Sequence, residues 1–451
     1  MNYSNINLNT QQVTAKKTNL YVSVKAKFII AITFSILWAL FSIYLSKDWI
    51  KDLASVTNLF IALFIITGIA YIPGFINAFL LASILLDKQP EFKNDDPMDE
   101  VTILIAAYNE ENGIYNTLSK IKEQDYKGKI NTIVINNNSS DNTVNEVYRA
   151  AKELNLKNVK CIDEPNPGKF NALNKGLKLT NTEYVITLDA DTLLHSKAIR
   201  YLVSRINSAP SDIAAVAGSV LVRNSRDNLL SKIQEWDYFL SIMSIKRMQG
   251  LFQGTLVAQG AFSIYKTELV KSLDGWSDAI GEDIVLTWQM LMKNNRVYFE
   301  PLAVSFTDVP TKFSHFYKQR SRWARGMIEG LRLVKPWQQP NMFLKFLTGI
   351  DLLIPYMDLS YTIFFIPGCV LALFGKFYIV GPIMLLVLPI TLLTFIIFYF
   401  KQKTFFKALN LKVRKNKLGF TTFILFYQMI MSPISLIGYL QELFGAKRVW
   451  K

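Results

Sequence analysis

The sequence predicts an α/β domain inserted between two groups of membrane-spanning helices. Of the 451 residues, 51% are hydrophobic and only 19% are charged, an unusual balance for a single soluble domain. The apolar residues gather in runs at 28–46, 57–86, 344–400 and 418–440, which are long enough to cross a bilayer. The stretch 87–341 between them alternates polar and apolar residues, as soluble domains do.

The first membrane group is expected at 28–86, as two transmembrane helices. Residues 1–27 contain lysines but no acidic residue, and no small-residue cleavage site follows them, so they are expected to form a cytosolic tail before a retained anchor. After two spans the chain is in the cytosol again. We therefore expect a multi-pass plasma-membrane protein with a cytosolic domain at 87–311.

The second membrane group is expected at 357–451, with about three spans near 357–375, 377–400 and 418–440. Residues 312–356 are interpreted as amphipathic helices at the membrane interface.

A basic loop at 401–417 contains no acidic residue and is expected in the cytosol, against anionic lipid. Three spans leave the C-terminal tail outside, whereas Lys447, Arg448 and Lys451 favour the inside. The sequence leaves the side of the C-terminus open.

Within the soluble stretch, strand-like and helix-like segments alternate. Such alternation predicts a parallel, Rossmann-like sheet whose ligands bind at the carboxyl ends of the strands. The expected strands are 101–107, 130–135, 158–162 and 184–188, and the expected helices are 111–124, 141–154 and 169–179. Polar clusters follow three of these strands directly, at 108–110, 136–141 and 189–191.

Composition limits the chemistry that this edge of the sheet can perform. The two cysteines, Cys161 and Cys369, fall in different parts of the chain, so they form neither a disulfide framework nor a thiolate zinc site. The two histidines exclude a histidine-rich metal site. A bound metal is therefore expected to be a hard cation held by carboxylates.

Asp189 and Asp191 follow an apolar strand with i, i+2 spacing, so their carboxylates project to the same side. Such a pair can share a divalent cation that bridges two phosphates, although loop or cap aspartates are the alternative. Upstream, Lys169 opens a helix after Gly168. An anion at this helix N-terminus would be stabilised by the free N–H groups and the lysine, whereas the alternative is a solvated side chain.

Two further segments offer groups for catalysis and binding. Asp283, in Gly281-Glu282-Asp283, is either a helix N-cap or a general base that reaches an acceptor hydroxyl. Gln319, Arg322 and Trp323 share one helix face, where amide and guanidinium donors suit a pyrophosphate and the indole suits a sugar ring. A basic helix that binds lipid phosphates is the alternative, but it leaves the Gln-Arg-Trp face unexplained.

Taken together, the motifs resemble those of the membrane-embedded processive glycosyltransferases of family 2, which include bacterial cellulose, hyaluronan, chitin and poly-N-acetylglucosamine synthases. The matching segments, in order, are 107–110, 137–141, 168–169, 189–191, 281–283 and 319–323. The runs 168–174 and 281–284 look most like those of the poly-β-1,6-N-acetylglucosamine synthases.

The resemblance implies a GT-A type domain and a role for each matching residue. Tyr108, Glu110, Asn137, Lys169, Asp189, Gln319 and Arg322 would bind the nucleotide-sugar donor, Asp191 with Asp189 would hold Mg²⁺ or Mn²⁺, Asp283 would be the catalytic base, and Trp323 with Glu282 would bind the acceptor. The family usually has an aspartate where Asn137 stands. This departure puts the base preference in question, since an amide both donates and accepts hydrogen bonds.

The implied reaction is inverting polymerisation of a UDP-sugar, most simply UDP-N-acetylglucosamine, into an exported β-linked polysaccharide. A β-glucan synthase that uses UDP-glucose and a non-processive enzyme that glycosylates a lipid phosphate are the alternatives. The expected partners are the donor, the growing polymer, the bilayer and a small membrane accessory subunit. Nucleic acid is not expected, because the basic residues cluster at the membrane flanks rather than along a groove of stacking aromatic residues.

Overall fold

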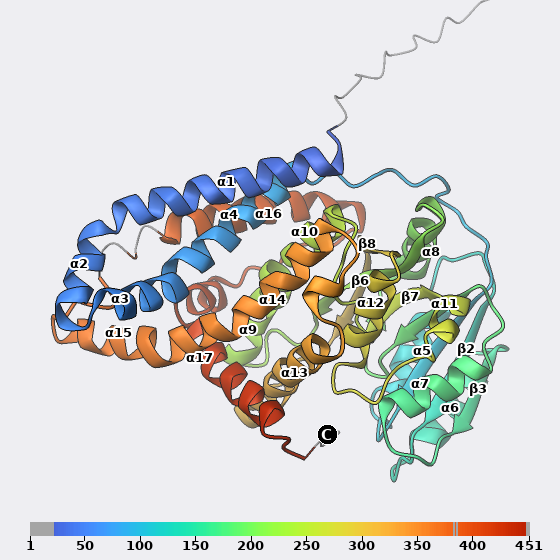
Figure 1. Cartoon of the computed structure of the whole chain (residues 1–451). Coiled ribbons are helices and arrows are strands. Elements are labelled where there is room, and N and C mark those ends of the chain that lie inside the picture. Colours follow the sequence, from blue (N-terminus) through green and yellow to red (C-terminus); the bar gives the residue numbers. More distant parts are fainter. Residues whose placement is uncertain (1–21, 382–383, 385–386, 448–451) are drawn as a thin grey trace, which may run out of the picture.

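The computed structural model describes residues 22–381, 384 and 387–447. Most of the expected tail at 1–27 lies outside these residues, as do Arg448 and Lys451. An elongated bundle of long helices lies beside an α/β domain, and the last described residues lie next to that domain (Figure 1). The expected fold class is confirmed.

In the part of the chain that the structure describes, eight strands form one sheet in the order β3-β2-β1-β4-β7-β6-β8-β5. Their bounds are β1 Val101–Ala107, β2 Ile130–Asn136, β3 Val159–Asp163, β4 Tyr184–Leu188, β5 Leu193–Leu194, β6 Ile213–Val222, β7 Phe262–Lys266 and β8 Arg296–Thr307. The four predicted strands are parallel neighbours, and β7 runs antiparallel to both β4 and β6. The carboxyl ends of β1, β2 and β4 therefore meet at one edge.

The three predicted helices are confirmed as α5 Ile114–Lys122, α6 Thr143–Glu153 and α7 Lys169–Lys178. Apolar residues of α7 pack on one face of the sheet, while those of α5 and α6 pack on the other. The remaining helices of the domain are α8 Ala198–Ser208, α9 Leu229–Trp236, α10 Met243–Leu251, α11 Thr267–Ser272, α12 Glu282–Met292 and α13 Phe313–Leu333. A π-helical segment, η2 (Asp237–Ile242), joins α9 to α10 without a break.

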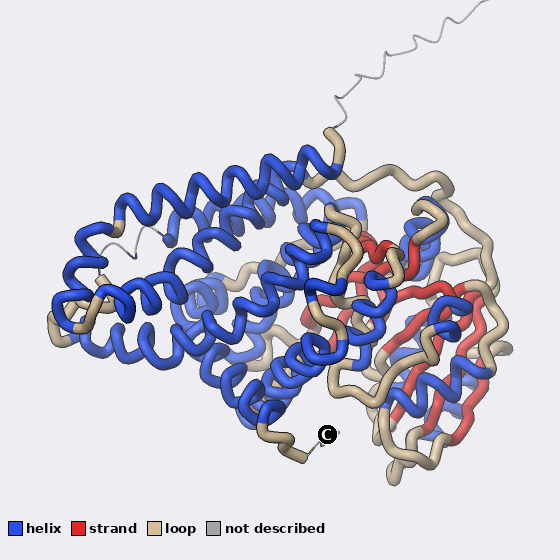
Figure 2. The backbone as a smooth tube through the Cα atoms, viewed as in Figure 1, coloured by secondary structure: helices blue, strands red, loops and turns tan. Residues whose placement is uncertain are grey.

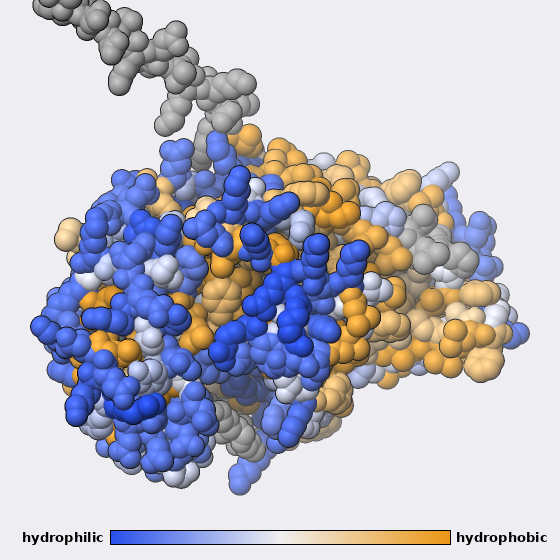
Figure 3. Space-filling view, turned by 180° about the vertical axis from the view of Figure 1, so that it is seen from behind, coloured by the Kyte–Doolittle hydropathy of each residue, from blue (hydrophilic) through white to orange (hydrophobic). Residues whose placement is uncertain are grey.

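The bundle is built of helices, whereas the described strands all lie in the α/β domain (Figure 2), and the surface of the bundle is markedly more hydrophobic than that of this domain (Figure 3). Among the described residues, four helical stretches are long and apolar enough to span a membrane: Val24–Leu45, Leu59–Leu86, Met342–Leu373 and Lys417–Leu443. The elements are α1 Val24–Leu45, α2 Lys47–Val56, α3 Leu59–Ile66, η1 Thr67–Tyr71, α4 Ile72–Leu86, η3 Pro336–Gln338, α14 Met342–Ser360, η4 Tyr361–Phe365, α15 Ile366–Leu373, α16 Val387–Ala408 and α17 Lys417–Leu443.

Two details of this part differ from the sequence expectation. The segment between the first two spans is helical, as α2, and the boundary expected at 356 falls inside one continuous helix, Met342–Leu373. The basic run 401–417 is also divided, because α16 continues to Ala408. The number of membrane crossings stays a prediction.

Buried ion pairs connect the α/β domain to the bundle. Arg247 of α10 pairs with Asp87 at the end of α4, and both side chains are almost fully buried. Asp237 of η2 forms an ion pair with Arg320 of α13 at 2.9 Å and accepts a hydrogen bond from the Tyr427 hydroxyl of α17 at 2.6 Å. Removing one partner of a buried pair leaves an uncompensated charge, so these contacts strongly favour one arrangement of the two parts.

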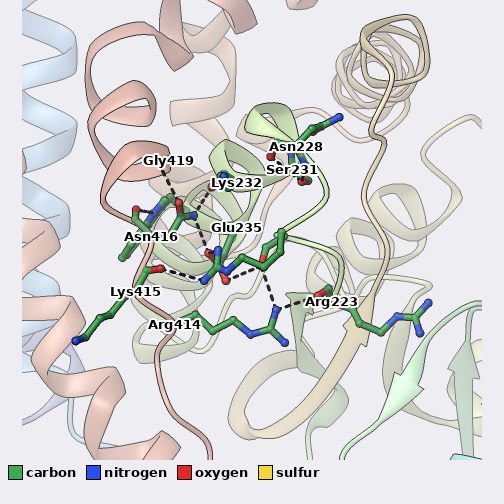
Figure 4. Close-up of polar contacts among 12 residues, drawn as sticks. Arg223, Asn228, Ser231, Lys232, Glu235, Arg414, Lys415, Asn416 and Gly419 are labelled. Atoms are coloured by element: carbon green, nitrogen blue, oxygen red, sulfur yellow. Dashed lines mark hydrogen bonds and ion pairs between the residues drawn. The ribbon is translucent and has the colours of Figure 1, made fainter.

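The linker between α16 and α17 docks on α9 (Figure 4). Asn416 donates to Glu235 Oε2 at 2.7 Å, and its carbonyl oxygen accepts from the indole of Trp236 at 2.8 Å. Arg414 donates to the carbonyl oxygen of Arg223 at 3.1 Å. These contacts fix the N-terminus of α17 against the α/β domain.

The second end of α17 also lies against this domain. Arg325 of α13 donates to Glu442 at 3.2 Å, and Ser321 of α13 donates to Gln441 at 2.9 Å. Both ends of α17 thus contact the α/β domain, and the helix itself is long and apolar enough to be the span expected at 418–440, which stays a prediction.

Candidate active site

A cavity of about 520 Å³ lies at the carboxyl ends of the central strands, between the start of α7, the loop before α12, and α13. The predicted residues that line it are Tyr108, Asn137, Lys169, Glu282 and Arg322. They come from segments as far apart in the sequence as Tyr108 and Arg322. The fold therefore brings five of the predicted residues together, whereas the others do not line this cavity: Glu110, Asp189, Asp191, Asp283, Gln319 and Trp323.

Asn137 is buried and uses its whole amide to hold the loop before α7. Its Nδ2 donates to the carbonyl oxygens of Glu164, at 3.0 Å, and Asn166, at 2.7 Å. Its Oδ1 accepts from the Gly168 N–H at 2.8 Å. An aspartate could accept the last bond but could not donate the first two, so asparagine suits this loop better.

Lys169 lies at the floor of the cavity among carboxylates. Its Nζ is 2.6 Å from Asp189 Oδ1 and 3.7 Å from Glu282 Oε1. Burial opposes the ammonium charge, yet Asp189 and Glu282 together raise the pKa of Lys169 above its ordinary value. A Cβ at Gly260 would lie 2.7 Å from this Nζ, so a side chain at residue 260 would displace the lysine ammonium.

The two predicted metal ligands, Asp189 and Asp191, follow β4 as expected. The pKa of Asp191 is raised to about 6. The main cause is desolvation by the surrounding protein, and the negative charges of Asp189 and Glu110 add to it. A divalent cation would relieve this repulsion, so the residues fit such an ion. No group of three or more metal-ligating side chains is present in the described residues, so phosphate or water oxygens would have to complete the coordination shell.

Asp283 lies in the first turn of α12, and its carboxylate faces the loop before β7. Its Oδ2 accepts from the Gly260 N–H at 3.2 Å, and its Oδ1 accepts from the Ile284 N–H at 2.9 Å. The N-cap of α12 is Gly281, so the N-cap interpretation of Asp283 is wrong.

Glycines let α12 approach α13 with no side chain between the two backbones. A Cβ placed on Gly281 would lie 3.0 Å from both the Cα and the carbonyl oxygen of Gly326. The Ile280 N–H donates to Glu329 of α13 at 2.6 Å. Glu282 and Asp283 are consequently fixed relative to the helix that contains Gln319 and Arg322.

On α13, Arg322 lines the cavity, whereas Arg320 points inward to Asp237. The guanidinium of Arg320 lies 4.1 Å from the ring centroid of Trp323, whose side chain is 38% exposed. The indole is thus supported by a cation and retains accessible surface. Gln319 Oε1 is buried, with no hydrogen-bond partner among the described residues.

Sequence reasoning missed two parts of the site. The loop at 257–260 contacts Asp283 through the backbone N–H of Gly260. The glycine itself is the only feature of this loop's sequence that indicates close packing. Lys447 lines the cavity from the far end of the chain, and no local motif marks it.

The amide of Asn137 leads to a structural prediction. Asn137→Asp removes both donors and places a carboxylate against two carbonyl oxygens, so the 164–168 loop should open more often. Hydrogen–deuterium exchange of the Gly168 amide should become about tenfold faster or more, since losing buried hydrogen bonds costs about 1–3 kcal/mol. Asn145→Asp, on the exposed face of α6, is the matched control. Unchanged exchange at Gly168 would contradict the role given to the amide.

Comparison with known proteins agrees with this geometry. Residues 97–326 match the family described as "Glycosyltransferase like family 2". The chain is 35% identical over 282 residues to a poly-beta-1,6-N-acetyl-D-glucosamine synthase of Staphylococcus aureus strain MSSA476, covering 61% of this chain and 67% of the relative. It is 36% identical over 230 residues to the synthase of the same name from Staphylococcus epidermidis, covering 51% of this chain and 55% of the relative.

A mannosyltransferase from Pyrobaculum calidifontis, solved in complex with GDP-Man and Mn²⁺, has the same fold. Its TM-score is 0.57 at 18% identity, and the match covers 94% of this chain and 100% of that one. The extent of the family match and the two synthase relatives together show that the chain belongs to glycosyltransferase family 2.

Proposed function

We propose that the chain is a processive, inverting glycosyltransferase that polymerises UDP-N-acetylglucosamine into a β-linked polysaccharide. The observation that carries this proposal is the 35% identity to a synthase named for that polymer. The cavity supports it, since Lys169, Glu282 and Arg322 line it and Asp283 follows Glu282 in the same turn of α12. UDP-glucose is the alternative donor, because no residue of the cavity by itself distinguishes the two sugars.

In the proposed reaction, Asp283 takes the proton of an acceptor hydroxyl. The acceptor oxygen forms a bond to the anomeric carbon of the donor, the bond from that carbon to the β-phosphate oxygen breaks, and UDP leaves. One displacement inverts an α-linked donor into a β-linkage. The Gly260 N–H keeps the Asp283 carboxylate oriented before the proton arrives.

Around the donor, Tyr108, Glu110 and Asn137 would form the nucleoside end of the pocket. Lys169, Gln319 and Arg322 would contact the diphosphate, with Glu282 and Trp323 on the acceptor side. Asp189 and Asp191 would hold Mg²⁺ or Mn²⁺, which offsets the charge that develops on the leaving diphosphate.

Export through the helical bundle is part of the same proposal, with the catalytic domain in the cytosol and the bundle in the plasma membrane. A buried carboxylate in the bundle supports a polar path. Asp358 of α14 accepts from Tyr439 at 2.7 Å and from Ser432 at 2.8 Å, both on α17. Ionisable residues among apolar helices commonly mark the route of a polar substrate. An accessory membrane subunit stays a prediction.

Asp283→Asn tests the base. The variant should bind UDP normally but lose polymer synthesis by about 100-fold or more, because general-base catalysis typically contributes 10²–10⁴-fold. The measurement is incorporation of labelled N-acetylglucosamine by purified protein in detergent with Mn²⁺. Asp274→Asn is the matched control on an exposed turn and should behave as wild type. Near-normal turnover of Asp283→Asn would remove the base assignment.

Asp191→Ala tests the metal site. Affinity for UDP in the presence of Mn²⁺ should fall by about tenfold or more, whereas affinity for uridine, which lacks phosphates, should not change. Asp95→Ala, an exposed acid outside the cavity, serves as the control. Equal binding of UDP by Asp191→Ala and wild type would contradict the ligand role.

Trp323→Ala tests acceptor binding by stacking. We expect shorter polymers and roughly a fivefold to tenfold lower yield, because stacking of this kind is worth about 1 kcal/mol or more. Polymer length is measured by gel filtration, with Trp337→Ala as an exposed tryptophan control. Transfer of a single sugar followed by arrest, in the wild type itself, would contradict processivity.

A further inference from the structure

The cavity contains one lysine that no motif of the sequence singles out. Lys447 lines it together with Lys169 and Arg322, although it follows Arg322 by more than a hundred residues. It comes from the segment after α17, which lies beside the α/β domain in Figure 1. Its presence there depends on how α17 ends.

α17 ends in a tight turn that redirects the chain. Gly445 has φ +65°, which favours glycine, and the Ala446 N–H donates to the Gln441 carbonyl oxygen at 2.8 Å. This is the pattern of a helix closed by a glycine in the left-handed conformation. The turn brings the residues after it back toward α13.

Arg325 then fixes the backbone of these residues. Its guanidinium donates to the carbonyl oxygen of Ala446 at 2.7 Å and to that of Lys447 at 3.3 Å. The same side chain pairs with Glu442 at 3.2 Å. Arg325 and Arg322 belong to the same helix, α13. The backbone at Lys447 is therefore held in a fixed position relative to the helix that lines the cavity.

The three basic residues that line the cavity differ in their ion pairs with the protein's own carboxylates. Lys169 already has Asp189 and Glu282 as carboxylate partners. Among the described residues, neither Arg322 nor Lys447 forms an ion pair. Asp278 and Glu282 also line the cavity, and the charge of Arg322 acts on Glu282. Without a direct ion pair in the described part of the chain, Arg322 and Lys447 nevertheless favour an anionic ligand between them.

We propose that Lys447 is a further donor-binding residue, which contacts the diphosphate of the nucleotide-sugar alongside Arg322. The inference rests on the proposed function and adds to it a contribution from the C-terminal segment. Arg325 acts as a positioning residue, since it holds the backbone of Lys447 without facing the ligand.

The test is nucleotide affinity measured by equilibrium dialysis on full-length protein in detergent with Mn²⁺. Lys447→Ala should weaken UDP binding about threefold to tenfold and leave uridine binding unchanged, since one exposed charge contact is lost. Lys447→Arg should restore UDP affinity. Lys157→Ala, an exposed lysine of the α/β domain, is the control and should match wild type.

The outcomes separate this inference from the proposed function. Wild-type affinity of Lys447→Ala for UDP would overturn the role of Lys447, as would an equal loss of affinity for UDP and uridine. Failure of the wild-type protein to bind UDP at all would instead overturn the proposed donor. Arg325→Met should lower the affinity for UDP, but by less than Lys447→Ala does. UDP binding by Arg325→Met should still weaken when salt is added.

Discussion

The arrangement of the site depends on the contact between Gly281 and Gly326. Two glycines allow the start of α12 and the middle of α13 to touch backbone to backbone, with a hypothetical Cβ only 3.0 Å from the opposing chain. Any side chain at either position would have to push the helices apart. Asp283, on α12, therefore keeps a constant position relative to Arg322 and the helix that lines the cavity.

Much of this arrangement follows from local sequence. The strands β1, β2 and β4 are short apolar runs bounded by polar clusters, and parallel pairing of such runs brings Tyr108, Asn137 and Asp189 to one edge. The direction in which each side chain points does not follow from local pattern. Asn137 turns its amide toward the 164–168 loop because unpaired carbonyl oxygens there need donors, which only the folded loop reveals.

Long-range contacts explain the remaining differences. Arg320 and Arg322 are separated by a single residue in the sequence, yet Arg320 pairs with buried Asp237 while Arg322 lines the cavity. Hydropathy marks α17 as long and apolar, but its two ends contact α9 and α13 of one domain. Lys447, which follows α17, lines the cavity of the α/β domain, a contact that hydropathy alone does not predict.

The π-helical segment η2 has a consequence for how the chain length can vary. Asp237 of this segment pairs with Arg320. On either side of it, Glu235 of α9 accepts from Asn416 in the linker between α16 and α17, and Arg247 of α10 pairs with Asp87. Each residue of an α-helix turns the chain by about 100°, and a π-turn accommodates one extra residue. A one-residue deletion here, other than of Asp237, would return the turn to an α-helix, so that α9 and α10 stay in phase and both sets of contacts can form. The π-turn is thus a place where the chain can lose one residue, whereas a one-residue change within α9 or α10 would rotate one set of contacts against the other.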